Sequence, residues 1–515
     1  MSETSGPNRR TRIPKLEPHE REQAESFERA LDEHPDEAMR RREFLGRTAA
    51  LAGAAGLATA LPIETLMGEA AKRQTLASQL PSARKLPIDT FVVVMMENRS
   101  YDHYFGWRED ADGRNKGLVY PDRNGNPTPT HHLGTDFQGC DFKDPNHSWD
   151  GGRHQYNAGK MDGFVQGNRQ GTGSDSFAAG YYLKGDVPYI PHAAQAFQLH
   201  DRFFCSAMAS TYPNRHYMWS AQAGGAKDNG SSIIGSGAPW ETIFDRALRN
   251  GVSASYFPTD VPFTVLYGPR GVPWTKPLSE YYERAAAGTL SNINFVDPAF
   301  ANPNGSGTSG DEHPHGDIRT GQAWMADVVN AFIASPQFRR GALFVVYDEW
   351  GGFFDHVPPR SVPDDRQSKD IHQNHGLTGF RIPAVTVSPY VKRGSVSHAT
   401  CAFESILKLI SYRFRLGYLT TRHRHAFNIG RTFDWRNPNF DRPRLPDPVN
   451  VVSQRCGPPR SQAARPKDHD MVELVKSGLL ERHGYDYRPA TPETMFREPD
   501  SVQQALREST PWLTD

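Results

Sequence analysis

The sequence lacks the features that define several large classes of protein. Only four of its 515 residues are cysteines, Cys140, Cys205, Cys401 and Cys456. Their spacing fits no metal site and they are too sparse for a disulfide scaffold, so we expect free thiols or at most one pair. The 59 basic and 59 acidic residues cancel. No basic surface of the kind that binds nucleic acid is therefore expected.

The chain is also poor in apolar residues. Hydrophobic residues make up 37% of it, with 45 glycines and 40 prolines, and the mean hydropathy is −0.66. This composition indicates long surface loops around a modest sheet. A length of 515 residues suits one large α/β core with insertions.

No apolar run is long enough for a confident membrane span. Residues 1–39 are polar and charged, typical of a disordered leader. In residues 40–70, Arg41 and Arg42 precede a short run rich in Ala, Gly and Leu. This pattern favours a twin-arginine signal, with the export machinery as a partner and the periplasm, cell wall or medium as destination. A basic amphipathic helix or a short anchoring helix is the alternative.

The first strong strand signal is the apolar run of residues 91–96, followed by Glu97 and Asn98. Its length and β-branched content predict a strand buried on both faces. Ligands bind at the carboxyl ends of such strands, so Glu97 and Asn98 can hold a metal or a polar substrate. The alternative is that they merely begin and cap a helix.

A second apolar run, residues 343–346, ends at Asp348 and Glu349. Adjacent buried carboxylates repel each other unless a cation lies beside them. Thr211 precedes Tyr-Pro-Asn and a helix-forming stretch, which predicts a helix N-terminus that favours an anion such as phosphate. A hydroxyl there can act as a nucleophile, although capping is its commoner use.

Two loop regions carry histidines. Residues 107–190 have little periodicity and contain His147 after a turn signal, where solvent exposure is the alternative to function. A Gly/Ser-rich turn then presents a polar cluster of Asp311, Glu312, His313, His315 and Asp317. A solvated acidic loop is the alternative there.

Other patterns complete an α/β alternation. Strands are predicted at residues 202–205, 252–257, 292–296 and 382–387, and helices at 240–250, 320–334, 402–414, 471–481 and 501–508. We predict a catalytic domain over residues 85–435. Residues 436–515 are expected to be a carboxyl-terminal extension that wraps the core.

The predicted site combines carboxylates, an amide and a hydroxyl. Oxygen ligands of this type suit a divalent cation such as Ca²⁺, Mg²⁺ or Mn²⁺ better than a thiolate-type zinc site, although zinc stays open. A cation beside a hydroxyl matches the cleavage of phosphoric esters.

Six ordered motifs resemble those of the bacterial phosphoesterase family, which includes phospholipases C and related acid phosphatases. They are MENRSYDHYFG, HSW, TYPNRHY, DEHP, YDEWGGFFDHVPP and RIPAVTVSPYVKRGSVSH. The resemblance covers residues 87–417. It implies an alkaline-phosphatase-like core, a three-layer α/β/α sandwich with a mostly parallel central sheet and long loop insertions.

The resemblance also implies roles for individual residues. Metal ligands would be Glu97, Asn98, Thr211, Asp348 and Glu349, with Thr211 forming a phospho-enzyme intermediate. Histidines that bind phosphate or protonate the leaving oxygen would be His147 and His313, with His356 as a further member. The assignment of Thr211 could shift to Ser210, and Trp350 stands where relatives usually have histidine.

The function expected is therefore an exported phospholipase C that contacts membrane surfaces at most transiently. Acid phosphatase activity on soluble phosphomonoesters uses the same residues and is the alternative. A non-enzymatic metal-binding scaffold is a third hypothesis. An apolar rim would favour lipid, and the residues that could form it are Phe257, Phe263, Tyr267, Trp274, Tyr281 and Tyr282.

Overall fold

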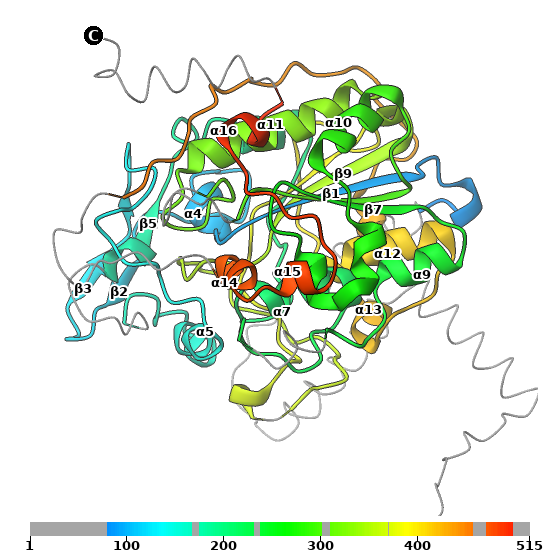
Figure 1. The fold of residues 1–515 in the computed structure, drawn as a ribbon. Coiled ribbons are helices and arrows are strands. Elements are labelled where there is room, and N and C mark those ends of the chain that lie inside the picture. Colours follow the sequence, from blue (N-terminus) through cyan, green and yellow to red (C-terminus); the bar gives the residue numbers. More distant parts are fainter. Residues whose placement is uncertain are drawn as a thin grey trace, which may run out of the picture. The chain divides into compact units, whose positions relative to one another are not determined.

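A computed structural model describes residues 80–166, 175–230, 237–300, 309–368, 370–456 and 470–497 (Figure 1). The chain divides into two compact units, Met1–Ser78 and Gln79–Asp515. All described residues belong to the second unit. The predicted leader, the twin-arginine region and the predicted helix at 501–508 lie outside the described residues.

The centre of the fold is a seven-stranded sheet with the order β11-β6-β10-β9-β1-β8-β7. Four neighbouring pairs are parallel, whereas β10 runs antiparallel to both β9 and β6. The predicted α/β fold with a mostly parallel central sheet is therefore confirmed. Its strands are β1 (Thr90–Met96), β6 (Gln198–His200), β7 (Ala254–Pro258), β8 (Ile293–Asp297), β9 (Gly341–Tyr347), β10 (Ala384–Val387) and β11 (Ser395–Ser397).

The two apolar runs form adjacent central strands. All seven residues of β1 and all seven of β9 are buried, as continuous apolar runs predict for strands covered on both faces. In the parallel register Val94 lies between Val345 of β9 and Val296 of β8. The carboxyl ends of β8, β1 and β9 therefore meet at one edge of the sheet.

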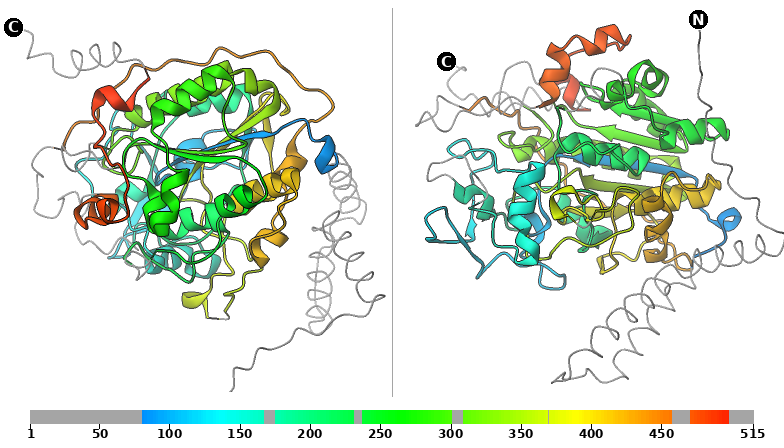
Figure 2. Two further views of the ribbon diagram at one scale, coloured as in Figure 1. Left: turned by 45° about the vertical axis from the view of Figure 1, so that its right-hand side comes forward. Right: turned by 90° about the horizontal axis from the view of Figure 1, so that it is seen from below.

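Helices cover both faces of this sheet, which gives the predicted three layers. Helices α10 and α11 lie on one face, and α7, α9 and α12 lie on the other (Figures 1 and 2). Each has an apolar side that packs on the strands or on a neighbouring helix. The bounds are α7 (Thr211–Ser220), α9 (Ile243–Arg249), α10 (Leu278–Ala287), α11 (Ile318–Ala334) and α12 (Phe403–Phe414).

Shorter elements lie outside the three layers. Strands β2 and β3 form a hairpin, and β4 pairs with β5 within the predicted loop region. These strands are β2 (Val119–Pro121), β3 (Pro127–Pro129), β4 (His131–His132) and β5 (Gly180–Tyr181). The other α-helices are α4 (Tyr101–Phe105), α5 (Trp149–Tyr156), α6 (Ile190–Ala196), α13 (Thr421–His425), α14 (Asp470–Lys476), α15 (Leu479–Arg482) and α16 (Pro492–Met495).

Two predicted elements are wrong in detail. The strand predicted at residues 202–205 lies earlier, at Gln198–His200, because β10 and β11 both pair with those residues. Phe203 and Phe204 form only isolated bridges. The helix predicted at 471–481 is two helices, because Gly478 adopts a left-handed φ of 68° between them.

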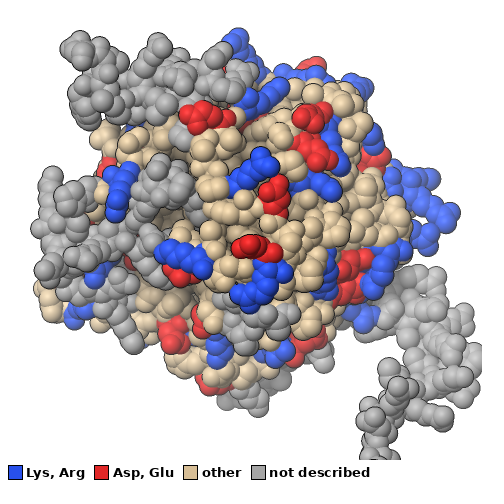
Figure 3. Space-filling view, viewed as in Figure 1, with Lys and Arg blue, Asp and Glu red and all other residues tan. Residues whose placement is uncertain are grey.

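One disulfide, Cys140–Cys456, joins the loop after β4 to the carboxyl-terminal segment across 316 residues. Cys205 and Cys401 are buried and take no part in a disulfide, so the prediction of at most one pair is confirmed. On the face in Figure 3, basic and acidic side chains are interspersed and neither sign forms a large patch. None of the helices within the described ranges combines the length and apolar character that a membrane span requires.

Candidate active site

The carboxyl ends of β1 and β9 place three carboxylates together. Glu97, Asp348 and Glu349 follow these strands directly and are fully buried. The backbone of Asp348 donates to Met96, which continues the pairing of the strands. Oδ1 of Asp348 accepts hydrogen bonds from the backbone N–H of Asn98 at 3.3 Å and of Glu349 at 2.7 Å. The predicted convergence of Glu97, Asn98, Asp348 and Glu349 is therefore present.

Thr211 reaches this group from another element. It is the first residue of α7, and its Oγ1 donates to Glu97 Oε2 at 3.2 Å. The Oγ of Ser210 donates instead to Asn229 Oδ1 at 3.0 Å, and that oxygen also accepts from the backbone N–H of Tyr212. The geometry thus points Thr211, and not Ser210, toward the carboxylates.

Arg215, one turn further along α7, is a central residue that the sequence analysis missed. Its guanidinium donates to Glu97 Oε1 at 3.0 Å and to Asp297 Oδ2 at 2.8 Å, and Nε lies 3.5 Å from Asp348 Oδ2. Asp297 ends β8 and also accepts from the Tyr256 hydroxyl at 2.7 Å. The TYPNRHY motif and the acidic end of β8 were the available signals.

The site holds more negative charge than Arg215 neutralises. Burial, followed by the charge of Glu97, raises the pKa of Asp348 well above its ordinary value. Burial, followed by the charge of Asp348, raises the pKa of Glu349 in the same way. Clustered buried carboxylates of this kind are stabilised by protons or by a further cation.

Several polar atoms here suit a divalent cation. At this edge of the sheet, four buried side-chain atoms have no hydrogen-bond partner among the described residues: both amide atoms of Asn98, Oδ2 of Asp348 and Oε1 of Glu349. Together with the oxygens of Glu97 and Thr211, they form an oxygen-rich donor set typical of hard cations. These residues fit the predicted metal. A bound divalent cation would supply positive charge that favours an ionised hydroxyl and neutralises phosphoryl oxygens.

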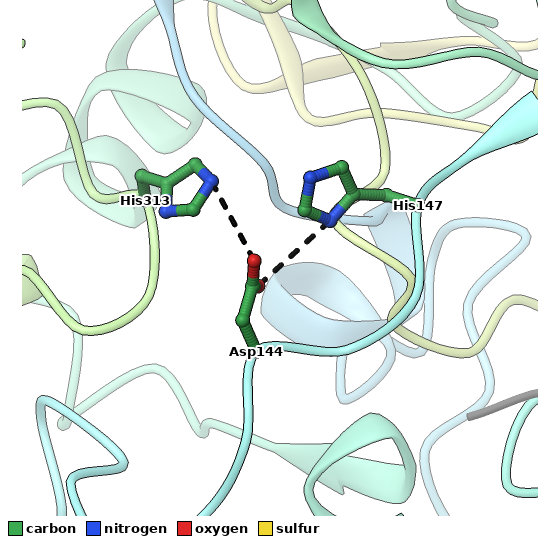
Figure 4. Close-up of side chains that lie close together, drawn as sticks. All are labelled: Asp144, His147 and His313. Carbon is green, nitrogen blue, oxygen red and sulfur yellow. Dashed lines mark ion pairs between the residues drawn. The ribbon is translucent and has the colours of Figure 1, made fainter. Parts of the chain in front are cut away.

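The two predicted histidines lie beside this group and face a common partner (Figure 4). His147 Nδ1 lies 3.8 Å from Asp144 Oδ1, and His313 Nε2 lies 3.8 Å from Asp144 Oδ2. His147 Nε2 is also 3.9 Å from Glu349 Oε1, which connects the histidines to the carboxylates. Asp144 was missed, although it stands three residues before His147 in the same turn motif.

The loop that carries His313 is anchored on the core. Glu97 N–H donates to the Asp311 carbonyl, and Arg99 donates to the Glu312 carbonyl from Nε at 3.0 Å and Nη2 at 2.6 Å. The carboxylate of Glu312 accepts from the hydroxyls of Tyr104 and Tyr347. Its burial raises the pKa to about 7. The cluster predicted here as a possible solvated loop is therefore largely internal.

Three residues of the predicted cluster have different positions. Glu312 is completely buried and adopts a φ of 76°, which is rare for a residue other than glycine. His315 Nε2 contacts the carbonyl of Phe142, and Asp317 caps α11 by accepting from the N–H of Arg319. His313 of this cluster faces Asp144.

The structure does not bring His356 into this group. Its Nδ1 lies 2.5 Å from Asp102 Oδ2 and its Nε2 lies 3.3 Å from Asp112 Oδ1. Arg381 completes that cluster by donating to Asp102 and Asp355. The predicted catalytic role of His356 has no support in this geometry, because the DHVPP turn carries its ring toward α4.

Two further expectations concern the surroundings of the site. Trp350 is buried and donates to Gln155 Oε1 at 2.7 Å, so its indole contacts α5. The six aromatic residues considered for an apolar rim are turned inward: five are buried and Tyr282 is partly buried. They therefore do not form such a rim.

Carboxylates, the hydroxyl of Thr211 and two histidines thus gather at one edge of the α/β sheet, and the comparisons with known proteins show to which family a chain with these motifs belongs. Residues 88–417 match the model of the phosphoesterase family, described as "Phosphoesterase family". The chain belongs to this family, as the motifs predicted.

Individual relatives carry related names. The chain is 30% identical over 348 residues to "Non-specific phospholipase C1" of Arabidopsis thaliana, a match that covers 62% of this chain and 64% of that protein. It is 28% identical to "Non-specific phospholipase C3" of the same plant over 69% of this chain and 75% of the relative. It is 27% identical to "Phospholipase C B" of Mycobacterium tuberculosis (strain ATCC 25618 / H37Rv), and this match covers 90% of this chain and 96% of that protein.

Proposed function

We propose that the protein is an exported, metal-dependent phosphoric-ester hydrolase of the phospholipase C type. It would cleave phospholipid to diacylglycerol and a phosphorylated head group through a phospho-threonine intermediate. The observation that carries this proposal is the 3.2 Å hydrogen bond from Thr211 Oγ1 to Glu97 Oε2. It directs a hydroxyl at a helix N-terminus toward a group of buried carboxylates.

The residues suggest an order of events. Thr211 attacks the phosphorus in line with the leaving oxygen, and Glu97 lies where it can hold the hydroxyl proton. The N-terminus of α7 and the guanidinium of Arg215 provide positive potential on the same side. His147 or His313 binds the phosphoryl oxygens or protonates the departing alcohol. Water then hydrolyses the phospho-threonine.

The names of the relatives support a phospholipid as substrate. One observation favours the alternative, acid phosphatase activity on soluble phosphomonoesters. Among the described residues, the exposed large hydrophobic side chains are Val119, Leu248 and Val449, which come from separate parts of the chain. The described surface therefore offers no concentrated apolar area for a lipid tail.

Export by the twin-arginine route belongs to the same proposal. It is motivated by Arg41 and Arg42 ahead of the Ala/Gly/Leu-rich run. Replacing both arginines by lysine should keep the protein in the cytoplasm of its host. Continued export of that variant would contradict this part of the proposal.

The nucleophile is tested with Thr211→Ala and with Ser210→Ala as the matched control. Loss of a nucleophile should lower kcat by about 1,000-fold or more, whereas Ser210→Ala should stay within a few fold of the wild type. Turnover of a dye phosphate ester is measured for both variants. If Ser210→Ala is inactive and Thr211→Ala is not, the hydroxyl has been assigned to the wrong residue.

The substrate class is tested on the wild-type protein. Release of phosphocholine from phosphatidylcholine is compared with release of phosphate from a monoester, each with and without a chelator. Faster phosphocholine release supports the phospholipase, and faster phosphate release supports the phosphatase. Activity that a chelator leaves unchanged rules out the metal-dependent mechanism, and no activity on any ester would favour a metal-binding scaffold.

A further inference from the structure

Trp350 connects the carboxylate pair at the end of β9 to helix α5. It follows Asp348 and Glu349 directly, and its side chain is fully buried. The indole N–H donates to Gln155 Oε1 at 2.7 Å. The six-membered ring of the indole faces Gly152 of α5, because a Cβ atom built on Gly152 would lie only 2.9 Å from Trp350 Cη2. Helix α5 therefore holds Trp350 by packing and by a hydrogen bond.

Gln155 also binds the loop that carries His147. Its side chain is fully buried, and its Nε2 donates to the carbonyl of Asn146 at 2.6 Å. An indole nitrogen only donates and a carbonyl only accepts, so one orientation of the amide satisfies both partners. Asn146 immediately precedes His147, whose Nδ1 lies 2.9 Å from the carbonyl of Pro145. Gln155 thus fixes the backbone on the amino side of His147.

These contacts form a closed cycle that begins and ends at Glu349. Its chain neighbour Trp350 donates to Gln155, and Gln155 donates to the backbone before His147. His147 Nε2 then lies 3.9 Å from Glu349 Oε1. Every other step of the cycle is a covalent connection or a hydrogen bond of defined length. The separation between His147 and Glu349 is therefore set by the rest of the cycle.

The turn after Trp350 leaves little room for adjustment. Gly351 and Gly352 adopt left-handed φ values of 64° and 73°, which favour glycine. A Cβ atom at Gly351 would lie 2.1 Å from the carbonyl oxygen of Asn98, and one at Gly352 would lie 2.8 Å from that of Asn146. The turn thus packs against the loop after β1 and against the loop before α5. A displacement of Trp350 would move both loops.

We propose that Trp350 and Gln155 are positioning residues that set the place of His147 beside Glu349. The inference rests on the proposed function, in which His147 binds the phosphoryl oxygens or protonates the departing alcohol. Trp350 and Gln155 act through His147 and not on the substrate. A displacement of about 1 Å in such a geometry can lower turnover by about 100-fold.

Two substitutions at Trp350 separate its hydrogen bond from its packing. Trp350→Phe keeps an aromatic ring but removes the donor, so kcat on a dye phosphate ester should fall by about 10- to 100-fold. Trp350→His keeps a ring N–H at the same position of a five-membered ring, and should stay within about fivefold of the wild type. Equal losses for the two variants would contradict the role of the hydrogen bond.

Gln155→Met removes both hydrogen bonds of the amide and should lower kcat as much as Trp350→Phe does. It is also the second variant if Trp350→Phe does not fold. Trp435→Phe is the matched control, because it removes an indole N–H that donates to the carbonyl of Gly430, and kcat should be unchanged. Unchanged turnover in both Trp350→Phe and Gln155→Met would overturn the inference.

A merely structural effect is recognised by combining Trp350→Phe with His147→Gln. If Trp350 acts through His147, the substitution should lower the residual kcat no further once His147 is replaced. Independent effects would multiply instead. An equal loss from Trp350→Phe in the wild type and in His147→Gln would therefore overturn the inference.

A readout without turnover distinguishes this inference from the proposed function. Magnetic resonance signals of the His147 ring are assigned in histidine-labelled protein by their loss in His147→Gln. They should move in Trp350→Phe and Gln155→Met but not in Trp435→Phe, with thermal unfolding showing that each variant is folded. A wild type that cleaves no phosphoric ester but shows these shifts would refute the function and support the positioning. A wild type that cleaves esters, with signals and turnover unchanged in both variants, would refute the positioning alone.

Discussion

Arg215→Met should destabilise the protein strongly, because it removes the cation from the centre of a buried acidic group. The guanidinium is 1% exposed and contacts Glu97, Asp297 and Asp348. Methionine keeps much of the volume of the side chain but cannot donate a hydrogen bond. The substitution therefore isolates the contribution of the charge.

The size of the effect follows from what remains. Removing one partner of a buried ion pair costs about 3–5 kcal/mol, because it leaves an uncompensated charge. Here Tyr256 still donates to Asp297 and Thr211 still donates to Glu97, so each carboxylate keeps one hydrogen bond. We expect the free energy of unfolding to fall by about 3 kcal/mol at pH 7.5, near the lower end of that range.

The deficit should also depend on pH. The charge of Arg215 lowers the pKa values of Asp297 and Asp348, so without it both pKa values rise further in the folded state, which then binds protons more tightly than the unfolded chain. Stability of the variant therefore increases as the pH falls. Between pH 7.5 and pH 5.5 the difference in the free energy of unfolding between the wild type and Arg215→Met should shrink by about 1 kcal/mol or more. A rise of one unit in the pKa of one carboxyl group is sufficient for a change of this size.

Urea unfolding in the presence of a chelator measures both effects without bound cations. Arg284→Met is the matched control, because Arg284 pairs with Glu280 on the partly exposed surface of α10 and should cost less than about 1 kcal/mol. The prediction is refuted if Arg215→Met lowers the free energy of unfolding no more than Arg284→Met does. It is also refuted if the destabilisation by Arg215→Met is larger at pH 5.5 than at pH 7.5.

Two further predictions concern the loops around the site. Burial raises the pKa of Glu312 from 4.5 to about 7. Between these pH values the folded state therefore holds a proton on Glu312 that the unfolded chain releases. The free energy of unfolding should fall by up to about 3 kcal/mol from pH 4.5 to pH 7. In urea unfolding with a chelator, Glu312→Gln should not show this fall in the free energy of unfolding. If the free energies of unfolding of the variant and the wild type change in parallel with pH, the prediction is wrong. Cys456→Ser should lower stability by about 2–4 kcal/mol, because it opens the disulfide to Cys140. A reductant should bring the wild type to the same unfolding midpoint and leave the variant unchanged, and a wild type insensitive to reductant would show that the bridge contributes little.

The strands that form the centre of the sheet were predictable from local sequence. The apolar runs at residues 91–96 and 343–346 are β1 and β9, and the acidic residues after them lie at the predicted edge. Continuous apolar runs define buried strands because both faces of such a strand must be covered. The short strand Gln198–His200 was misplaced because its position depends on pairing with β10 and β11, which the local sequence does not contain.

Part of the site was predictable because local sequence patterns identify the elements that carry it. Residues at strand ends and at the start of α7 were identified because elements with clear patterns position them. Arg215 was missed because an arginine inside a helix carries no local sign that it is buried. Asp144 was missed because a loop aspartate beside a proline is ordinarily a turn residue.

By itself, the sequence determined the α/β class, the family and the residues that end the central strands, because hydrophobic patterns and ordered motifs are properties of short segments. Only the tertiary structure decided which distant groups meet. It directed Thr211 rather than Ser210 toward Glu97, gave His356 to a cluster with Asp102, and set Asp144 between two histidines. Such contacts depend on the packing of segments far apart in the chain, so neither composition nor spacing encodes them locally.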